Sequence, residues 1–190
     1  MGMAPAIYYT ADMVRAMPDD GNRYEVVYGE LLVTPAPRWW HQELAFRLAK
    51  AIDAYLETEP VGRVVMSPAD ISWGPDVLVQ PDVFVAPARE LATLEWANVQ
   101  TLLLVAEVLS PSTARADRIL KRRRYQEARV PCLWLVDGDA QLVEVWTPDD
   151  RFPHFERERL VWHPAGAGSA FTLALEALFR PIDPDPPRRA

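Results

Sequence analysis

The sequence contains little cysteine, histidine and glycine. Its single cysteine, Cys132, excludes an internal disulfide and a thiolate metal site. The three histidines have no metal-ligand spacing. Among the 8 glycines we find neither a glycine-rich phosphate loop nor a Gly-x-Ser-x-Gly nucleophile turn. These absences argue against a zinc-finger protein, a P-loop nucleotide hydrolase and a serine hydrolase of the α/β type.

Long apolar runs are also missing. The longest are five residues, at 102–106 and 132–136, whereas a membrane-spanning helix needs about 18 or more. The N-terminal residues have no basic segment followed by an apolar core, so the sequence predicts no secretory signal. We therefore expect a cytoplasmic protein.

The net charge is -7, from 20 basic and 27 acidic residues. This balance argues against a generic, sequence-blind nucleic-acid binder, which should be basic overall. It leaves room for a local basic surface. Residues 115–129 hold seven basic and two acidic side chains, and they are the one candidate footprint for phosphate. A solvated helix face is the alternative interpretation.

A chain of 190 residues can bury a sizeable core as one domain. We expect a single domain over 1–180 and a proline-rich, disordered tail over 181–190. Apolar spacing predicts helices at 10–17, 41–57 and 114–128, with a short one ending near 179. Strands are expected within 24–33, 64–66, 71–73, 83–85, 102–108, 132–137, 142–146 and 155–162. This order implies an α/β domain with a mixed central sheet.

Two acidic residues stand in apolar surroundings. Glu107 ends the apolar strand, and Asp82 leads directly into the apolar residues 83–85. An ionised carboxylate in such a place is costly unless it is paired, hydrogen-bonded or bound to a cation. If the two strands are neighbours, both carboxylates meet at one sheet edge and form a hard-oxygen site suited to Mg²⁺ or Mn²⁺. Alternatively, each caps a loop or faces water.

A lysine lies on the helix that follows this strand. Lys121 and Asp117 form an i, i+4 pair of favourable orientation. On spacing alone, an ordinary exposed salt bridge is the favoured interpretation of this pair.

These residues belong to a longer pattern. It comprises Asn22-Arg23-Tyr24-Glu25-Val26-Val27-Tyr28-Gly29-Glu30-Leu31, Pro35-Ala36-Pro37, His41, Gln80-Pro81-Asp82-Val83, Glu107-Val108-Leu109-Ser110-Pro111-Ser112-Thr113, Asp117, Lys121, Tyr125 and Val130-Pro131-Cys132-Leu133-Trp134-Leu135-Val136-Asp137. The pattern resembles a bacterial family of putative restriction endonucleases in the PD-(D/E)XK nuclease superfamily. The resemblance implies the restriction-endonuclease-like fold, a central mixed β-sheet flanked by helices.

The resemblance also implies a metal site. Asp82 resembles the superfamily's metal-binding aspartate, and Glu107 resembles the acidic residue on the next core strand. Both would hold Mg²⁺, with Mn²⁺ as a substitute, together with the backbone carbonyl of Val108. The lysine expected two positions after Glu107 is replaced by Leu109. Lys121 matches the helix lysine that takes its place in this family, where it would orient water or stabilise charge at phosphorus.

Two further residues are second-tier catalytic candidates. Glu30 lies at the predicted hairpin, and His41 opens the long helix. Either would complete the metal shell or position substrate. For His41, a helix-start residue hydrogen-bonded to nearby backbone is an equally good interpretation. Trp39 and Trp40 precede it; they would stack on bases or, as the favoured interpretation, pack onto the long helix or a partner chain.

The leading hypothesis is a metal-dependent endonuclease that hydrolyses DNA phosphodiester bonds, acting as a homodimer. A homodimer would bring two active sites to the two strands of a duplex. The second hypothesis is a nuclease-fold module with weak or no activity that binds nucleic acid or protein. The third is an unrelated two-carboxylate hydrolase acting, for instance, on sugars. A lysine between the two carboxylates would argue for the nuclease.

Overall fold

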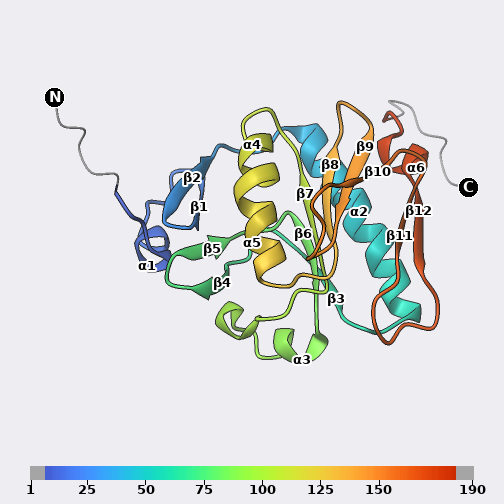
Figure 1. Ribbon diagram of the computed structural model, residues 1–190, viewed down its shortest axis with the longest axis horizontal. Coiled ribbons are helices and arrows are strands. Elements are labelled where there is room, and N and C mark those ends of the chain that lie inside the picture. The colour runs from blue at the N-terminus through green and yellow to red at the C-terminus, as the bar shows by residue number, and fades with distance from the viewer. Residues whose placement is uncertain (1–6, 183–190) are drawn as a thin grey trace, which may run out of the picture.

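The computed structural model describes residues 7–182 (Figure 1), and most of the tail predicted at 181–190 lies outside the described residues. None of the helices in residues 7–182 combines the length and the apolar character that a membrane span requires.

Helices are interspersed with groups of consecutive strands along the chain. The helical elements are α1 (Ala11–Arg15), α2 (Trp39–Thr58), α3 (Ala88–Leu91), η1 (Trp96–Asn98), α4 (Ala114–Ala116), η2 (Asp117–Lys121), α5 (Arg122–Glu127) and α6 (Leu175–Phe179). The strands are β1 (Arg23–Val27), β2 (Glu30–Thr34), β3 (Arg63–Met66), β4 (Ile71–Gly74), β5 (Val77–Val79), β6 (Val83–Ala86), β7 (Leu104–Val108), β8 (Leu133–Asp137), β9 (Leu142–Trp146), β10 (His154–Glu156), β11 (Arg159–Trp162) and β12 (Phe171–Ala174).

The central sheet has six strands in the order β10-β9-β8-β7-β6-β3. Strands β7 and β8 are parallel, and the other neighbours in this sheet are antiparallel. Helix α2 lies on one side of the sheet and the continuous helix α4–η2–α5 on the other (Figure 1). The predicted fold, a mixed sheet flanked by helices, is confirmed.

The inner strands are apolar on both faces because both faces are covered. In β6, Val83 and Val85 pack into the core against α2, whereas Phe84 and Ala86 pack into the core on the opposite face. Such strands lack the polar alternation of a half-exposed strand. A polar residue in this register therefore points into protein rather than into water.

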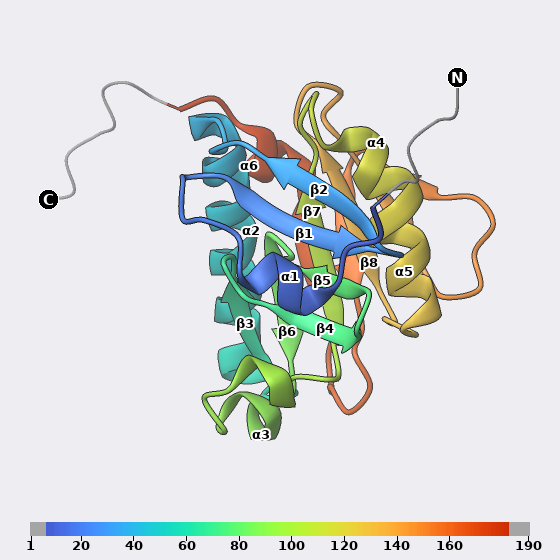
Figure 2. The same ribbon diagram turned by 90° about the vertical axis from the view of Figure 1, so that its left-hand side faces the viewer.

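A second sheet, with the order β2-β1-β5-β4, is formed largely from the N-terminal part of the chain. Figure 2 shows it in front of the central sheet, with α2 on one side and α5 on the other. The β1–β2 hairpin turns at Tyr28 and Gly29, whose φ angles of 55° and 75° are both left-handed. This sheet places β1 over the end of strands β6 and β7 at which Asp82 and Glu107 stand.

Candidate active site

The structure brings Asp82 and Glu107 together at one end of the central sheet. Strands β6 and β7 pair antiparallel with Val83 opposite Ala106, so the residues just outside that pair, Asp82 and Glu107, are also neighbours. The Asp82 backbone N–H donates to Glu107 Oε2 at 3.3 Å. Both side chains are buried, with exposed fractions of 5% and 1%.

Lys121, on the α4–η2–α5 helix, contacts the Glu107 carboxylate of this pair. Its Nζ lies 2.7 Å from Glu107 Oε1 and 3.4 Å from Asp117 Oδ1. Both Asp117 and Lys121 are buried, so the expected exposed salt bridge is wrong. The two residues bound η2, a π-helical segment inside the α4–α5 helix. Such segments recur at functional sites because they redirect side chains locally.

His41 also joins the cluster. Its Nε2 lies 3.1 Å from Asp82 Oδ2, and its Nδ1 is buried without a hydrogen-bond partner among the described residues. The alternative interpretation, a hydrogen bond to nearby backbone, is not what the structure shows. Val108 lies beside the same oxygen, because its backbone N–H donates to Asp82 Oδ2 at 2.9 Å.

Glu30 does not join the cluster. It is exposed at the start of β2, opposite Val27 of β1, and no ion pair or hydrogen bond among residues 7–182 links its side chain to Asp82 or Glu107. Its expected role in the metal shell therefore has no geometric support. The same hairpin instead contributes Glu25, whose Oε1 lies 3.1 Å from Lys121 Nζ and accepts the backbone N–H of Gln80 at 2.7 Å.

Two more residues of the cluster belong to the sequence pattern but had no predicted role. Arg23 donates through Nη1 to Asp82 Oδ1 at 2.9 Å. Tyr125, fully buried, donates its hydroxyl to Glu107 Oε1 at 2.6 Å. Tyr125 stands one helical turn after Lys121, and this spacing on one helix face is the signal that would have identified it.

The environment separates the pKa values of the two central carboxyl groups. Burial raises the pKa of Glu107 to about 8, and repulsion from Asp82 and the other carboxylates adds to it against the attraction of Lys121. Burial acts in the same direction on Asp82. However, the hydrogen bond from His41 and the charges of Arg23 and Lys121 outweigh it and hold the pKa of Asp82 below its ordinary value. Paired carboxyl groups with separated pKa values can divide acid and base roles between them.

A cleft of about 710 Å³ leads to the cluster. Asp82, His41 and Arg23 line it, whereas Glu107 and Lys121 are not among its lining residues. The segments 34–38 and 110–113 form parts of its wall. A substrate would therefore approach from the Asp82 side, with Glu107 and Lys121 behind it.

The residues suit a hard divalent cation in type and charge. The cluster contains four carboxyl groups and two side chains that are permanently cationic, so it is negative when all carboxyl groups are ionised. No three His, Cys, Asp or Glu side chains within 7–182 form a ready-made metal cage. Mg²⁺ does not require one, because proteins commonly bind it through one or two carboxylates plus water and substrate phosphates. Asp82 and Glu107 meet that requirement.

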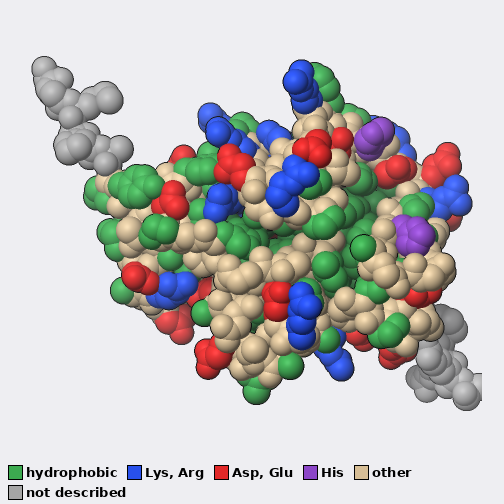
Figure 3. All heavy atoms as spheres, turned by 60° about the horizontal axis from the view of Figure 1, so that its bottom comes forward, with side chains coloured by type: hydrophobic (Ala, Val, Ile, Leu, Met, Phe, Trp, Pro, Cys, Tyr) green, Lys and Arg blue, Asp and Glu red, His purple; other side chains and the backbone are tan. Residues whose placement is uncertain are grey.

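The basic run over 115–129 is largely paired within the protein, which weakens its interpretation as a phosphate footprint. Six of its seven basic side chains already contact other groups of the protein in ion pairs, hydrogen bonds or contacts with aromatic rings, those of Arg123 and Arg129 at the surface: Arg118, Lys121, Arg122, Arg123, Arg124 and Arg129. On the face drawn in Figure 3, acidic and basic side chains are interleaved. The charge of this helix serves mainly to hold the fold and the cluster.

The mixed sheet and the buried carboxylate–lysine cluster at its end define a restriction-endonuclease-like nuclease fold. The chain belongs to the Uma2 family, described as "Putative restriction endonuclease", whose family model matches residues 11–176. It is also similar to a crystal structure of a putative nuclease of DUF820 from Anabaena variabilis ATCC 29413, with a TM-score of 0.73 and 21% identity over 90% of this chain and 97% of that one. No curated protein gives a significant match.

Proposed function

We propose that the protein is a metal-dependent endonuclease that hydrolyses phosphodiester bonds in DNA. The observation that carries this proposal is the buried Asp82–Glu107 pair with Lys121 Nζ 2.7 Å from Glu107. The lysine favours a nuclease over a two-carboxylate sugar hydrolase, because it supplies a fixed positive charge beside the carboxylates. Membership in a family of putative restriction endonucleases supports the same reaction. We also propose that the enzyme acts in the cytoplasm.

Asp82 and Glu107 would hold Mg²⁺, or Mn²⁺ in its place, together with the main-chain carbonyl of Val108. When bound, the cation supplies a Lewis acid that polarises the phosphodiester and activates water. The remaining work falls to protein side chains. Lys121 keeps its proton, because the attraction of Glu107 and the other carboxylates outweighs burial and raises its pKa. It therefore places a permanent positive charge beside the site, where it can stabilise negative charge on the reacting phosphate.

Arg23 and His41 fix the orientation of Asp82. One carboxylate oxygen accepts from Arg23 at 2.9 Å, and the other lies 3.1 Å from His41 Nε2. Tyr125 restrains Glu107 in the same way. Catalytic groups held in position by such contacts need little reorganisation during reaction.

Incubation of the purified protein with plasmid and short DNA substrates tests the proposal. Cleavage is expected with Mg²⁺ or Mn²⁺, none with EDTA, and a loss of at least about 100-fold in Asp82→Asn and Glu107→Gln. Arg159→Gln, a substitution of an exposed arginine on β11, serves as a matched control and should cut normally. Equal cleavage by the wild type and both carboxylate variants would refute the assignment.

A second candidate is a nuclease-fold module that binds without efficient cutting. One observation favours it: all four carboxylate oxygens of Asp82 and Glu107 already lie within contact distance of an N–H or O–H group of the protein. Calorimetric titration with Mn²⁺ separates the two candidates. The endonuclease should bind Mn²⁺ and lose that binding in Asp82→Asn, whereas a pure binding module need not bind the ion. The homodimer stays a prediction that light scattering can test.

A further inference from the structure

Trp39 is an exposed tryptophan at the first residue of α2. Its exposed fraction is 63%, the largest of any tryptophan in residues 7–182. Its neighbour Trp40 behaves differently, because it packs against the core and carries the Arg47 guanidinium 5.4 Å from its ring centre. Packing within the chain is therefore confirmed for Trp40, whereas packing of Trp39 onto a partner chain stays a prediction. Leaving an indole ring this exposed forgoes a large gain from burial.

Trp39 is adjacent in the chain to residues that line the cleft of the candidate active site, although it is not a lining residue itself. Arg38, the residue before it, lines the cleft, as do His41 and Gln42. Residues three apart on a helix share a face, so Trp39 shares the face of Gln42. His41, which contacts Asp82, is two residues after Trp39 and points to a different side of the helix. A chain bound at Asp82 that leaves the cleft along α2 would pass Trp39.

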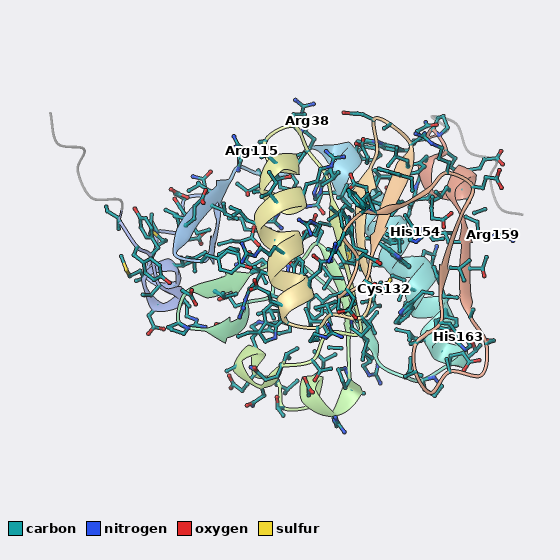
Figure 4. The ribbon with its side chains drawn as sticks, in the orientation of Figure 1. Arg38, Arg115, Cys132, His154, Arg159 and His163 are labelled. Atoms are coloured by element: carbon teal, nitrogen blue, oxygen red, sulfur yellow. The ribbon has the colours of Figure 1, made fainter. Side chains whose placement is uncertain are left out.

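The neighbouring residue, Arg38, has a guanidinium group without a polar partner among residues 7–182. The Arg38 guanidinium makes no ion pair or hydrogen bond with other residues of the described part of the chain, in contrast to the arginines on α5. The same is true of Arg115 on α4. Figure 4 shows both arginines at the same end of the molecule, extending outward from the starts of α2 and α4. Exposed arginine beside an exposed aromatic ring is the combination that binds single-stranded nucleic acid.

We propose that Trp39 stacks on an unpaired base of single-stranded DNA whose backbone passes Arg38 into the cleft. This inference rests on the proposed nuclease function and specifies its substrate. The preferred substrate is then single-stranded DNA or a duplex with a frayed or unpaired segment.

A second copy of the chain is the competing occupant of this face. It would also have to cover Phe46, two turns further along α2 and 55% exposed. The adjacency of Trp39 to Arg38, which lines the cleft, favours nucleic acid, because an interface between copies does not require it. Phe46 therefore distinguishes the two occupants.

Fluorescence anisotropy with labelled oligonucleotides in EDTA tests the inference without cleavage. Trp39→Ala should weaken single-strand binding roughly five- to 150-fold, as expected for one lost base–aromatic stack, and Trp39→Phe should retain most of it. Trp96→Ala is the matched control, since Trp96 is 40% exposed on η1, near α3 at the other end of the molecule from the start of α2 (Figure 1). Phe46→Ala should bind normally.

Two further measurements separate stacking from charge. An abasic oligonucleotide keeps the phosphates and lacks the bases, so wild type and Trp39→Ala should bind it equally. Arg38→Gln should lower the slope of log K against log salt by about 0.7, the value for one phosphate contact on a single strand. Trp39→Ala should leave that slope unchanged.

Unchanged single-strand binding in Trp39→Ala would overturn the inference, and so would a wild type that binds no oligonucleotide. A change of oligomeric state in Trp39→Ala and Phe46→Ala, seen by light scattering, would overturn it in favour of an interface between copies. Failure of the nuclease is distinguishable from these outcomes. In that case the wild type binds single strands through Trp39 but cuts nothing when Mg²⁺ is restored.

Discussion

At the scale of single residues, Lys121 holds the cluster together. It is the only cation that contacts Glu107 among the described residues, and it also lies near Glu25 and Asp117. Buried ion pairs gain little over apolar packing, but removing one partner leaves the other charge uncompensated. The lysine is therefore expected to stabilise the fold in addition to its role in the proposed chemistry.

Substituting Lys121 by Met should lower the free energy of unfolding by about 3–5 kcal/mol, because the carboxylates it contacts would be left buried without their cation. Urea denaturation measures this loss. Arg123→Ala is the matched control on the same helix, since Arg123 makes an exposed pair with Glu127 and should cost about 0.5 kcal/mol or less. Equal effects of the two substitutions would contradict the account of the cluster.

Tyr125→Phe removes one hydroxyl from the same network. Glu107 Oε1 would keep Lys121 but lose the hydrogen bond of 2.6 Å. We expect a loss of about 1–3 kcal/mol in stability and a fall in kcat larger than any change in KM, because Glu107 would be less firmly oriented. A variant with wild-type stability and kcat would show that the hydroxyl has no positioning role.

Cys132 is a buried free cysteine outside the candidate site. Burial raises the pKa of its thiol to about 12, so the thiolate that reacts with alkylating agents is scarce at neutral pH. Iodoacetamide at pH 8 should leave the native protein unmodified and modify it fully in denaturant, as followed by mass spectrometry. Rapid modification of the folded protein would contradict the buried position.

At the scale of elements, sequence patterns located the strands that carry Asp82 and Glu107 but missed Glu25. The uninterrupted apolar character of β6 and β7 indicates burial on both faces, so an acid at their ends stands out. In β1, Glu25 alternates with apolar residues in the manner of a solvent-facing side chain. Glu25 is buried because the β2-β1-β5-β4 sheet packs over the end of the central sheet. This packing is a tertiary effect that the local sequence does not indicate. Strand β5, only three residues long, and the π-helical segment leave equally weak sequence signals.

The β1–β2 hairpin depends on Gly29. The glycine adopts a φ of 75°, and a Cβ there would collide with the Tyr8 ring. Gly29→Ala should therefore destabilise the protein by at least about 1 kcal/mol and weaken the placement of Arg23 and Glu25. Gly168→Ala, where a Cβ would make only ordinary contact with Glu59, is the control. Equal melting temperatures for the two variants would contradict this view of the turn.

At the scale of the whole molecule, the net charge of -7 does not show which charged side chains are paired and which are free to bind a ligand. Most basic side chains on the α4–η2–α5 helix form ion pairs with other residues of the protein. The number of basic residues on that helix therefore overestimates how many are available to bind phosphate. The exposed Arg38 and Arg115 carry no such partner in residues 7–182. Sequence analysis could count the charges but could not tell which of them the fold neutralises.

If Asp82 and Glu107 together form a metal centre, a crystal soaked in Mn²⁺ will show the ion between them. The anomalous difference map should show a peak within coordination distance of both carboxylates in the wild type and none in Asp82→Asn. A map with no peak at this pair, obtained from crystals whose cleft is open to solvent, would contradict the account.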